Sequence, residues 1–258
     1  MTALSVEIRA KTYAARTPGA DHLALRDLSF DIPEGQFACI VGPSGSGKTT
    51  LLNVIGGLDR AVEGSVRFGG GDGAAPANLP IGYMFQTPRL FPWLSVLDNV
   101  RIVMDRAAAE GEAERLLTEM HLGDVMHAFP NRLSGGMQRR VALARAFAVK
   151  PRLLLMDEPF ISLDAPVAEK LRALLLETWK ARRTTVLFVT HDLGEALALA
   201  DRILFLSPSP GRIVLDLPVN LPRPRHLEDP AVRALRRDLL GRYPQLLAGL
   251  VNVAPGRD

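Results

Sequence analysis

The strongest constraint on the fold lies in eight residues, Gly42-Pro43-Ser44-Gly45-Ser46-Gly47-Lys48-Thr49. They match the pattern of a phosphate-binding loop: a glycine, four residues, then glycine, lysine and threonine. The apolar run Phe37–Val41 precedes them and a helical pattern at 49–55 follows, which is the setting that such a loop needs. Glycines let backbone N–H groups turn toward one point, where the helix N-terminus adds partial positive charge. The sequence therefore predicts a binding site for phosphate groups.

The side chains of this loop suit a nucleotide bound together with Mg²⁺. Lys48 can neutralise the outer phosphates, and the Thr49 hydroxyl can reach the metal ion, with Thr50 beside it in the predicted helix. The alternative is a glycine-rich turn between a strand and a helix that binds nothing. The strand and helix around the loop favour nucleotide binding.

Two carboxylates, Asp157 and Glu158, follow the apolar run at 153–156. A carboxylate at the end of a strand can hold Mg²⁺ through water, because Mg²⁺ keeps much of its hydration shell. Its neighbour can orient and deprotonate an attacking water molecule. Alternatively, one of the two is an exposed acid at a strand end, but the glycine loop favours the catalytic interpretation.

Apolar strands alternate with helical patterns along much of the chain. The runs at 37–41, 153–156 and 185–190 are typical of buried strands, with helical spacing between the last two. This order indicates an α/β fold with a parallel sheet, in which ligands bind beyond the carboxyl ends of the strands. The glycine loop, the paired carboxylates and His191 each follow a strand. We therefore expect them to meet at one edge.

Other segments differ from this pattern. Alternating residues at 6–10 and 28–32 predict strands in the N-terminal part, and residues 87–150 predict an inserted helical subdomain. The glycine-rich segment 69–73 predicts a hairpin turn rather than a second phosphate loop. A short helical extension at about 226–250 ends the chain.

Composition argues against several classes of protein. Lys and Arg number 31 against 28 Asp and Glu, a difference of +3 that does not demand nucleic acid as a partner. The single cysteine, Cys39, lies in an apolar run, where we expect a buried thiol. One cysteine cannot form an internal disulfide framework, so a reducing compartment fits best. The first residues lack a secretion-signal pattern, and no apolar run reaches the roughly 18 residues that span a bilayer. We expect a soluble chain.

A third segment, Leu133-Ser134-Gly135-Gly136-Met137-Gln138, precedes a helical pattern at 137–149. Ser134 can cap this helix, whose N-terminus then forms a second anion-binding helix end. One nucleotide does not need two such sites from the same chain. The alternative interpretation is a plain capped helix.

This run, LSGGMQ, resembles the signature of ABC ATPases letter for letter, and the resemblance covers nearly the whole chain. It implies a single domain over 1–258 with a P-loop NTPase (RecA-like) core and a mainly parallel sheet. It also implies an N-terminal antiparallel β subdomain and an inserted α-helical subdomain. In that family, the signature of one subunit closes over the γ-phosphate held by the other in a head-to-tail dimer. The implied partner is a second copy of this chain.

Single residues take their roles from the same resemblance. Gln86 looks like the glutamine that reaches Mg²⁺ and the attacking water, and His191 looks like the histidine that contacts the γ-phosphate. Tyr13 resembles the aromatic residue that stacks on adenine, although it could equally be a half-buried tyrosine at a strand end. Asp164 matches the loop that crosses the dimer interface. Ile161 departs from the usual small residue, which puts the packing of this loop in doubt.

The implied site has three groups of residues. The catalytic residues are Lys48, Gln86, Glu158 and His191. Mg²⁺ is held by Thr49, Gln86 and Asp157. ATP is bound by Tyr13, Gly42, Pro43, Ser44, Gly45, Ser46, Gly47, Lys48, Thr49, Thr50, Ser134, Gly135, Gly136, Gln138 and Asp164.

The segment 90–100 bears on the subfamily. Phe91, Trp93 and Leu94 either pack in the core of the helical subdomain or line an exposed groove that receives a short helix of a membrane subunit. Together with the motifs at 206–213 and 221–225, the segment looks like the nitrate, sulfonate and taurine importer branch of ABC ATPases.

This branch implies an ATPase that energises uptake of a small solute. The implied partners are two transmembrane permease subunits and, indirectly, an extracytoplasmic binding protein, with no nucleic acid. The implied location is peripheral, at the cytoplasmic face of the inner membrane. The alternatives are the ATPase of an exporter or lipid-transport system and a soluble nucleic-acid-associated ABC ATPase.

Overall fold

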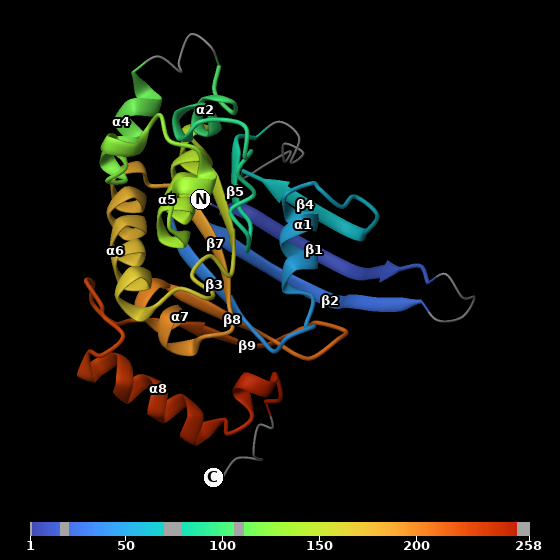
Figure 1. Cartoon of the computed structure of the whole chain (residues 1–258). Helices are drawn as coiled ribbons and strands as arrows, with labels where there is room; N and C mark the ends of the chain where they lie inside the picture. Colours follow the sequence, from blue (N-terminus) through green and yellow to red (C-terminus); the bar gives the residue numbers. More distant parts are fainter. Residues whose placement is uncertain (1, 16–20, 70–78, 106–110, 252–258) are drawn as a thin grey trace, which may run out of the picture. The chain divides into compact units, whose positions relative to one another are not determined.

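The computed structural model describes residues 2–15, 21–69, 79–105 and 111–251 (Figure 1). The chain forms two compact units. The first comprises Met1–Asn78 and Thr185–Asp258, and the second comprises Leu79–Thr184. We call the first the loop unit, because it contains the glycine loop, and the second the signature unit, because it contains Ser134. Among the described residues, no helix is both long and apolar enough to cross a membrane.

An antiparallel sheet forms one part of the loop unit. Its order is β2-β1-β4, and β1 pairs with both neighbours. Leu4, Val6 and Ile8 alternate along β1 and are buried, as a half-buried strand requires. The predicted N-terminal antiparallel strands are confirmed, although they are longer than the sequence pattern indicates. The bounds are β1 (Thr2–Tyr13), β2 (His22–Pro33) and β4 (Glu63–Phe68).

A second sheet in the loop unit holds the glycine loop. β3 lies between β7 and β8 and pairs with both in parallel, while β9 adds an antiparallel edge on β8. Every residue of β3 is buried, which accounts for its continuous apolar run. Cys39 lies in this strand as a buried thiol, as predicted. The bounds are β3 (Phe37–Val41), α1 (Lys48–Ile55), β7 (Thr185–Thr190), α7 (Leu193–Leu199), β8 (Arg202–Leu206) and β9 (Ile213–Pro218).

The proline- and arginine-rich segment near 221–225 attaches the C-terminal helices, α8 (Pro230–Arg242) and η4 (Leu246–Ala248). Arg225 is buried and donates to the carbonyl oxygens of Leu197 at 2.7 Å and Ala200 at 2.8 Å, which lie at the end of α7. These bonds satisfy carbonyls that the helix leaves without partners. Burial lowers the pKa of Arg225 to about 10, so it remains charged at neutral pH.

The signature unit contains a parallel strand pair and a group of helices (Figure 1). Helix α5 is central, since it packs against α2, α4, α6 and β5. A Cβ at Gly82 in β5 would lie 2.3 Å from the Ala146 carbonyl oxygen, so only glycine allows this approach to α5. The bounds are β5 (Ile81–Met84), α2 (Val96–Arg101), α4 (Glu112–Glu119), η2 (Gly123–Val125), η3 (Pro130–Arg132), α5 (Gly135–Ala148), β6 (Leu153–Asp157) and α6 (Ala165–Arg182).

Several predictions of local structure can be compared with these elements. The mainly parallel α/β fold is confirmed within the described residues. His22, His121, His127 and His226 are exposed. All but Gly69 of the turn predicted at 69–73 lies outside the described residues.

A fully buried amide organises the start of α2. The Asn99 side chain accepts from the Phe91 N–H at 2.8 Å and donates to the carbonyl oxygens of Phe91, Leu94 and Ser95 at 2.9–3.1 Å. Ser95 caps the same helix by accepting from the Asp98 N–H at 3.0 Å. Segment 91–95 is therefore fixed by one side chain rather than by a ladder of main-chain bonds.

Replacing Asn99 with Ala should lower the free energy of unfolding by about 1–3 kcal/mol, because it leaves buried main-chain groups without partners. Urea denaturation of the full chain measures this loss. Asn131 is exposed, so Asn131→Ala is the matched control and should change stability by less than about 0.5 kcal/mol. Equal free energies of unfolding for the Asn99 and Asn131 variants would contradict the conclusion that the Asn99 side chain fixes segment 91–95.

Candidate nucleotide site

The backbone of the glycine loop has the shape that phosphate binding requires. Gly45 and Gly47 have left-handed φ angles of 77° and 88°. A Cβ at Gly47 would lie 2.6 Å from the Leu25 side chain and 3.0 Å from the Ala24 carbonyl oxygen, so no other residue fits there. The loop joins buried β3 to the N-terminus of α1, where main-chain N–H groups have no partners within the helix. This geometry fits an anion bound by the main chain.

Lys48 supplies positive charge at the same loop. Its side chain is buried, and Nζ donates to the carbonyl oxygens of Gly42 at 2.9 Å and Pro43 at 2.8 Å. Ser46 is also buried, and its hydroxyl is without a hydrogen-bond partner among the described residues. Thr49 is exposed at the start of α1. The donors of this loop therefore suit the oxygens of a polyphosphate.

Tyr13 lies at the end of β1 beside α1. Its ring is 38% exposed, and its hydroxyl donates to the Thr50 hydroxyl at 3.3 Å. Nζ of Lys11 lies 4.5 Å from the ring centroid and is held by the Asp59 carboxylate at 2.7 Å and the Ala61 carbonyl oxygen at 2.8 Å. The hydrogen bond from Lys11 lowers the pKa of Asp59. Lys11 was not predicted to lie at this site, and the only sequence signal for it is a lysine two residues before the tyrosine.

His191 stands at the carboxyl end of β7, at the same sheet edge as the glycine loop. Val41, the last residue of β3, pairs with Thr190 in the parallel ladder. The Thr190 hydroxyl donates to the buried Glu195 carboxylate at 2.7 Å and accepts from the Asp192 N–H at 3.1 Å. The turn that carries the exposed His191 is thereby fixed. Within the loop unit, the expected convergence on one sheet edge is found.

A corresponding edge exists in the signature unit. Met84, the last residue of β5, pairs with Met156 in β6, so Gln86 and the adjacent carboxylates Asp157 and Glu158 follow neighbouring parallel strands. Asp157 is 5% exposed, Glu158 is half-buried and Gln86 is exposed. Burial raises the pKa of the neighbouring Tyr83, and the negative charge of Asp157 adds to this shift.

The loop that follows β6 has an unusual backbone. Glu158 and Ser162 have positive φ angles of 43° and 62°, which side chains disfavour. The Ile161 N–H donates to the Glu158 carbonyl oxygen at 3.2 Å. Asp164 ends the loop and caps α6, since its carboxylate accepts from the Val167 N–H at 2.9 Å. Such conformations persist only where neighbouring groups hold them, and they cluster at functional sites.

The signature segment forms the capped start of α5. Ser134 accepts from the Met137 N–H at 3.3 Å. A Cβ at Gly136 would lie 2.6 Å from the Val167 side chain, so this glycine permits close contact with the first turn of α6. The Gln138 amide donates to the Pro130 and Leu133 carbonyl oxygens at 3.0 and 3.4 Å. Ser134 and Gly135 are exposed, as a surface that receives a ligand must be.

The predicted residues therefore fall into two sets. The loop unit contains Tyr13, residues 42–50 and His191. The signature unit contains Gln86, residues 134–138, Asp157, Glu158 and Asp164. Among the described residues, no group of three or more His, Cys, Asp or Glu side chains is placed to hold a metal ion.

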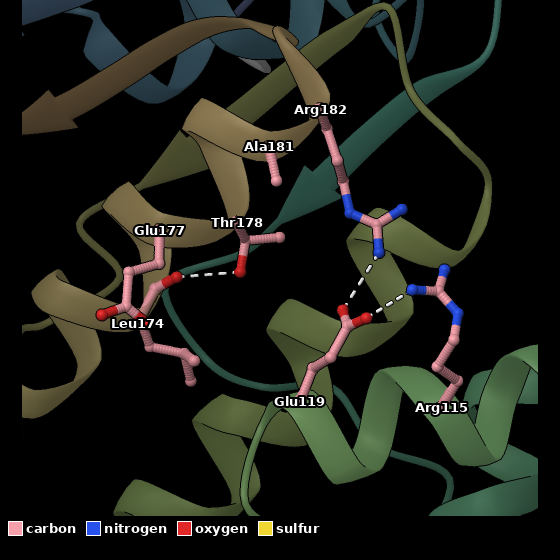
Figure 2. A pocket seen from close by; sticks show the side chains of 7 residues that line it. All are labelled: Arg115, Glu119, Leu174, Glu177, Thr178, Ala181 and Arg182. Atoms are coloured by element: carbon pink, nitrogen blue, oxygen red, sulfur yellow. Dashed lines mark hydrogen bonds and ion pairs between the residues drawn. The ribbon is translucent and has the colours of Figure 1, made fainter.

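A hollow of about 460 Å³ in the signature unit is distinct from these motifs (Figure 2). Residues of α4 and α6 line it, and Glu119 pairs with both Arg115 and Arg182. Both guanidinium groups thus already have a carboxylate partner. None of the lining residues belongs to the predicted nucleotide site.

Trp93 does not fill the core. Its side chain is 70% exposed, and the neighbouring Phe91 ring, with its centroid 5.5 Å away, is 37% exposed. The interpretation of Trp93 as a core residue is therefore wrong. The exposed pair needs another explanation.

The chain is similar to known proteins along most of its length. A family model described as "ABC transporter" matches residues 25–161. The aliphatic sulfonates import ATP-binding protein SsuB 2 of Burkholderia lata is 44% identical over 246 residues, covering 94% of this chain and 87% of the relative. SsuB 2 of Rhodococcus jostii is 48% identical over 86% of this chain and 87% of its own length. SsuB of Bacillus subtilis is 36% identical over 93% of this chain and 94% of its own length.

Solved structures share the fold. The dimeric post-hydrolysis state of the ATP-binding cassette MJ0796, bound to ADP and Pi, has a TM-score of 0.73 and 32% identity. The match covers 84% of this chain and 99% of that one. Another dimeric structure of MJ0796 gives a TM-score of 0.72 at 33% identity, with the same coverage.

Replacing Lys48 with Ala should weaken ATP binding by about 10- to 100-fold, because it removes a buried charge at the phosphate loop. Titration with a fluorescent ATP analogue measures the dissociation constant. Lys170→Ala removes an exposed lysine from α6 and should leave the affinity unchanged. Parental affinity in the Lys48 variant would refute the phosphate assignment.

Proposed function

Because the chain belongs to the ABC transporter family, we propose that it hydrolyses ATP to drive import of a small sulfonate-, nitrate- or taurine-like solute. The observation that carries this proposal is the identity of 36–48% to three bacterial proteins, each named as an aliphatic sulfonates import ATP-binding protein. These relatives are named as import subunits and give no support to an exporter or a nucleic-acid-associated ATPase.

The proposed reaction is in-line attack of water on the γ-phosphorus of ATP. The N–H groups of residues 42–49 and the Lys48 ammonium bind the phosphates, and Tyr13 stacks on adenine. Glu158 accepts a proton from the attacking water as the new oxygen–phosphorus bond forms. The bond from the γ-phosphorus to the bridging oxygen breaks, and ADP leaves. His191 and Lys48 stabilise charge on the phosphoryl oxygens, and Gln86 orients the water.

Bound Mg²⁺ would neutralise phosphate charge, and Thr49, Gln86 and Asp157 are the residues that would hold it. Their chemistry fits, because each offers an oxygen, the kind of ligand that Mg²⁺ prefers. A dedicated metal cage would not be required, since phosphate oxygens and water would supply the remaining ligands.

The working form is a dimer with a second copy of the chain. Each chain has one glycine loop and one signature, so Ser134, Gly135, Gly136 and Gln138 of one copy serve the ATP held by the other. Asp164 lies in the loop that crosses between copies. The dimeric state of MJ0796, to which this chain is 32% identical, supports this arrangement.

Two permease subunits complete the transporter, with the chain at the cytoplasmic face of the membrane. The exposed Phe91–Trp93 pair suits a permease helix, because it presents aromatic surface on a segment that Asn99 holds rigid. An extracytoplasmic binding protein delivers the solute. In this proposal, all of 1–258 acts as one ATPase module, in which 87–150 is the helical part and 226–250 is a terminal extension.

Replacing Glu158 with Gln should reduce the ATPase kcat by about 100-fold or more, because the amide cannot accept the proton. ATP binding should persist, and a dimer should accumulate with ATP in size-exclusion chromatography with light scattering. Glu63→Gln, an exposed change in β4, should keep the parental rate and form no stable dimer. Parental turnover in Glu158→Gln would exclude Glu158 as the base.

Replacing Trp93 with Ala should leave folding and basal ATPase activity unchanged, because the side chain is mostly exposed. It should abolish solute uptake in vesicles that contain the permease. Leu58→Ala removes a side chain of similar exposure, 62%, from the loop unit and should preserve uptake. Full uptake with Trp93→Ala would rule out the docking role.

A further inference from the structure

Three arginines of helix α5 donate to main-chain carbonyls of neighbouring segments. Arg140 donates to Met120 and His121, beyond the end of α4, and Arg145 donates to Pro88 and Arg89. Arg139 differs from them in what it holds. Its acceptors belong to Gln86 and to the loop that carries Glu158.

Arg139 joins three points of the predicted catalytic apparatus. Its Nη1 donates to the Gln86 carbonyl oxygen at 2.9 Å and to the Pro159 carbonyl oxygen at 2.6 Å, and its Nη2 donates to the Ile161 carbonyl oxygen at 2.8 Å. The side chain is 8% exposed, so these bonds form largely away from water. Each acceptor is the backbone of a predicted catalytic residue or of the loop directly after Glu158.

We propose that Arg139 is a positioning residue for ATP hydrolysis, which holds Gln86 and the 158–164 loop in fixed register with the signature helix. The proposal rests on the proposed function. It assigns Arg139 no contact with ATP or with the attacking water. Its effect is transmitted through the backbones that carry Gln86 and Glu158.

The chemistry of arginine suits this task. A guanidinium presents several N–H donors in one rigid plane, whereas a lysine ammonium is a single point charge on a flexible stem. Arg139 therefore reaches two strand-end segments at once. Its buried charge also strengthens each bond, because a charged donor binds a carbonyl more tightly than a neutral one.

The loop that Arg139 holds needs support. Glu158 and Ser162 both have positive φ angles, and Arg139 bonds to the two carbonyls of Pro159 and Ile161 that lie between them. These bonds use the backbone of Ile161 and not its side chain. The bulky residue at this position is thus compatible with a loop that is held by its carbonyl groups.

The position of Arg139 on α5 connects it to the signature. Ser134 caps this helix, and Gly136 contacts Val167, three residues beyond Asp164. Arg139 lies about one turn further along the same helix. Helix α5 is therefore tied to the segment 158–167 at two points. When Ser134 and Gly136 engage the nucleotide of the second copy, the Arg139 bonds fix Glu158 and Gln86 relative to that contact.

Arg139→Gln and Arg139→Lys test this role in the full chain with Mg²⁺ and ATP. Glutamine is neutral and shorter, and lysine keeps the charge but offers one nitrogen in place of the two that bind the three carbonyls. Arg140→Gln is the matched control, because it removes the next arginine of α5 and two carbonyl bonds at another site. Steady-state kcat and KM, the Kd of a fluorescent ATP analogue and the melting temperature are measured for each variant.

We expect Arg139→Gln to lower kcat by about tenfold or more, with Arg139→Lys in between. The Kd for the ATP analogue should stay within about twofold of the parent, because the phosphate loop and Tyr13 are intact. Arg140→Gln should keep the parental kcat. If Arg139→Gln does not fold, the folded Arg139→Lys variant decides, and its kcat must fall without a change in Kd.

Parental kcat in a folded Arg139 variant overturns the proposal, as does an equal loss of kcat in Arg140→Gln. A loss confined to ATP affinity also overturns it, since it would place Arg139 in binding rather than positioning. The proposed function fails separately, if the parental chain does not hydrolyse ATP or if Glu158→Gln is fully active.

Discussion

Convergence of main-chain N–H groups on one point is the constraint on which the loop unit depends. Such groups converge only where side chains do not intervene, which is why Gly45 and Gly47 have left-handed φ angles and Gly47 has no space for a Cβ. A glycine-rich loop has little stiffness of its own, so its ends must be rigid. Buried β3, paired on both sides, fixes one end, and α1 fixes the other. The same parallel pairing carries His191 to that edge, so the need for a main-chain anion site accounts for the local fold.

In the signature unit, the main chain contributes hydrogen-bond acceptors, its carbonyl oxygens, rather than N–H donors. Arginines of α5 donate to carbonyl oxygens at the ends of β5, β6 and α4, so one helix fixes the loops that carry the proposed catalytic residues. Burial lowers the pKa of Arg139, and water cannot easily replace the bonds that this buried guanidinium makes. Because the bonds use backbone oxygens, they leave the side-chain identity at Pro159 and Ile161 open. The bond from Arg139 to this loop is therefore compatible with the bulky Ile161 side chain.

Much of this could be predicted from sequence, because the informative residues act locally. The glycine loop and Ser134 are recognisable by their place at the start of a predicted helix, and the runs at 37–41 and 185–190 match β3 and β7. Asp164 was identified only by the family resemblance, and its capping of α6 was not predicted. Lys11, Asn99 and Arg139 were not predictable in the same way. Arg139 contacts residues 20, 22 and 53 positions away, and in sequence it is merely one arginine on a helix. The exposure of Trp93 was likewise undecided, since an apolar residue beside prolines suits a core and a docking surface equally.

Helix α5 also bears on how transport and hydrolysis are linked. Arg145 holds the carbonyls of Pro88 and Arg89 at 2.7 and 2.9 Å, shortly before the exposed Phe91–Trp93 pair, while Arg139 holds the Glu158 loop from the same helix. Asn99 in turn fixes Phe91. A permease helix docked on Trp93 would contact a segment that is hydrogen-bonded to α5 through Arg145. Arg145 lies about two turns from Arg139 on this helix. Helix α5 therefore bonds both to the segment that precedes the Phe91–Trp93 pair and to the loop that follows Glu158.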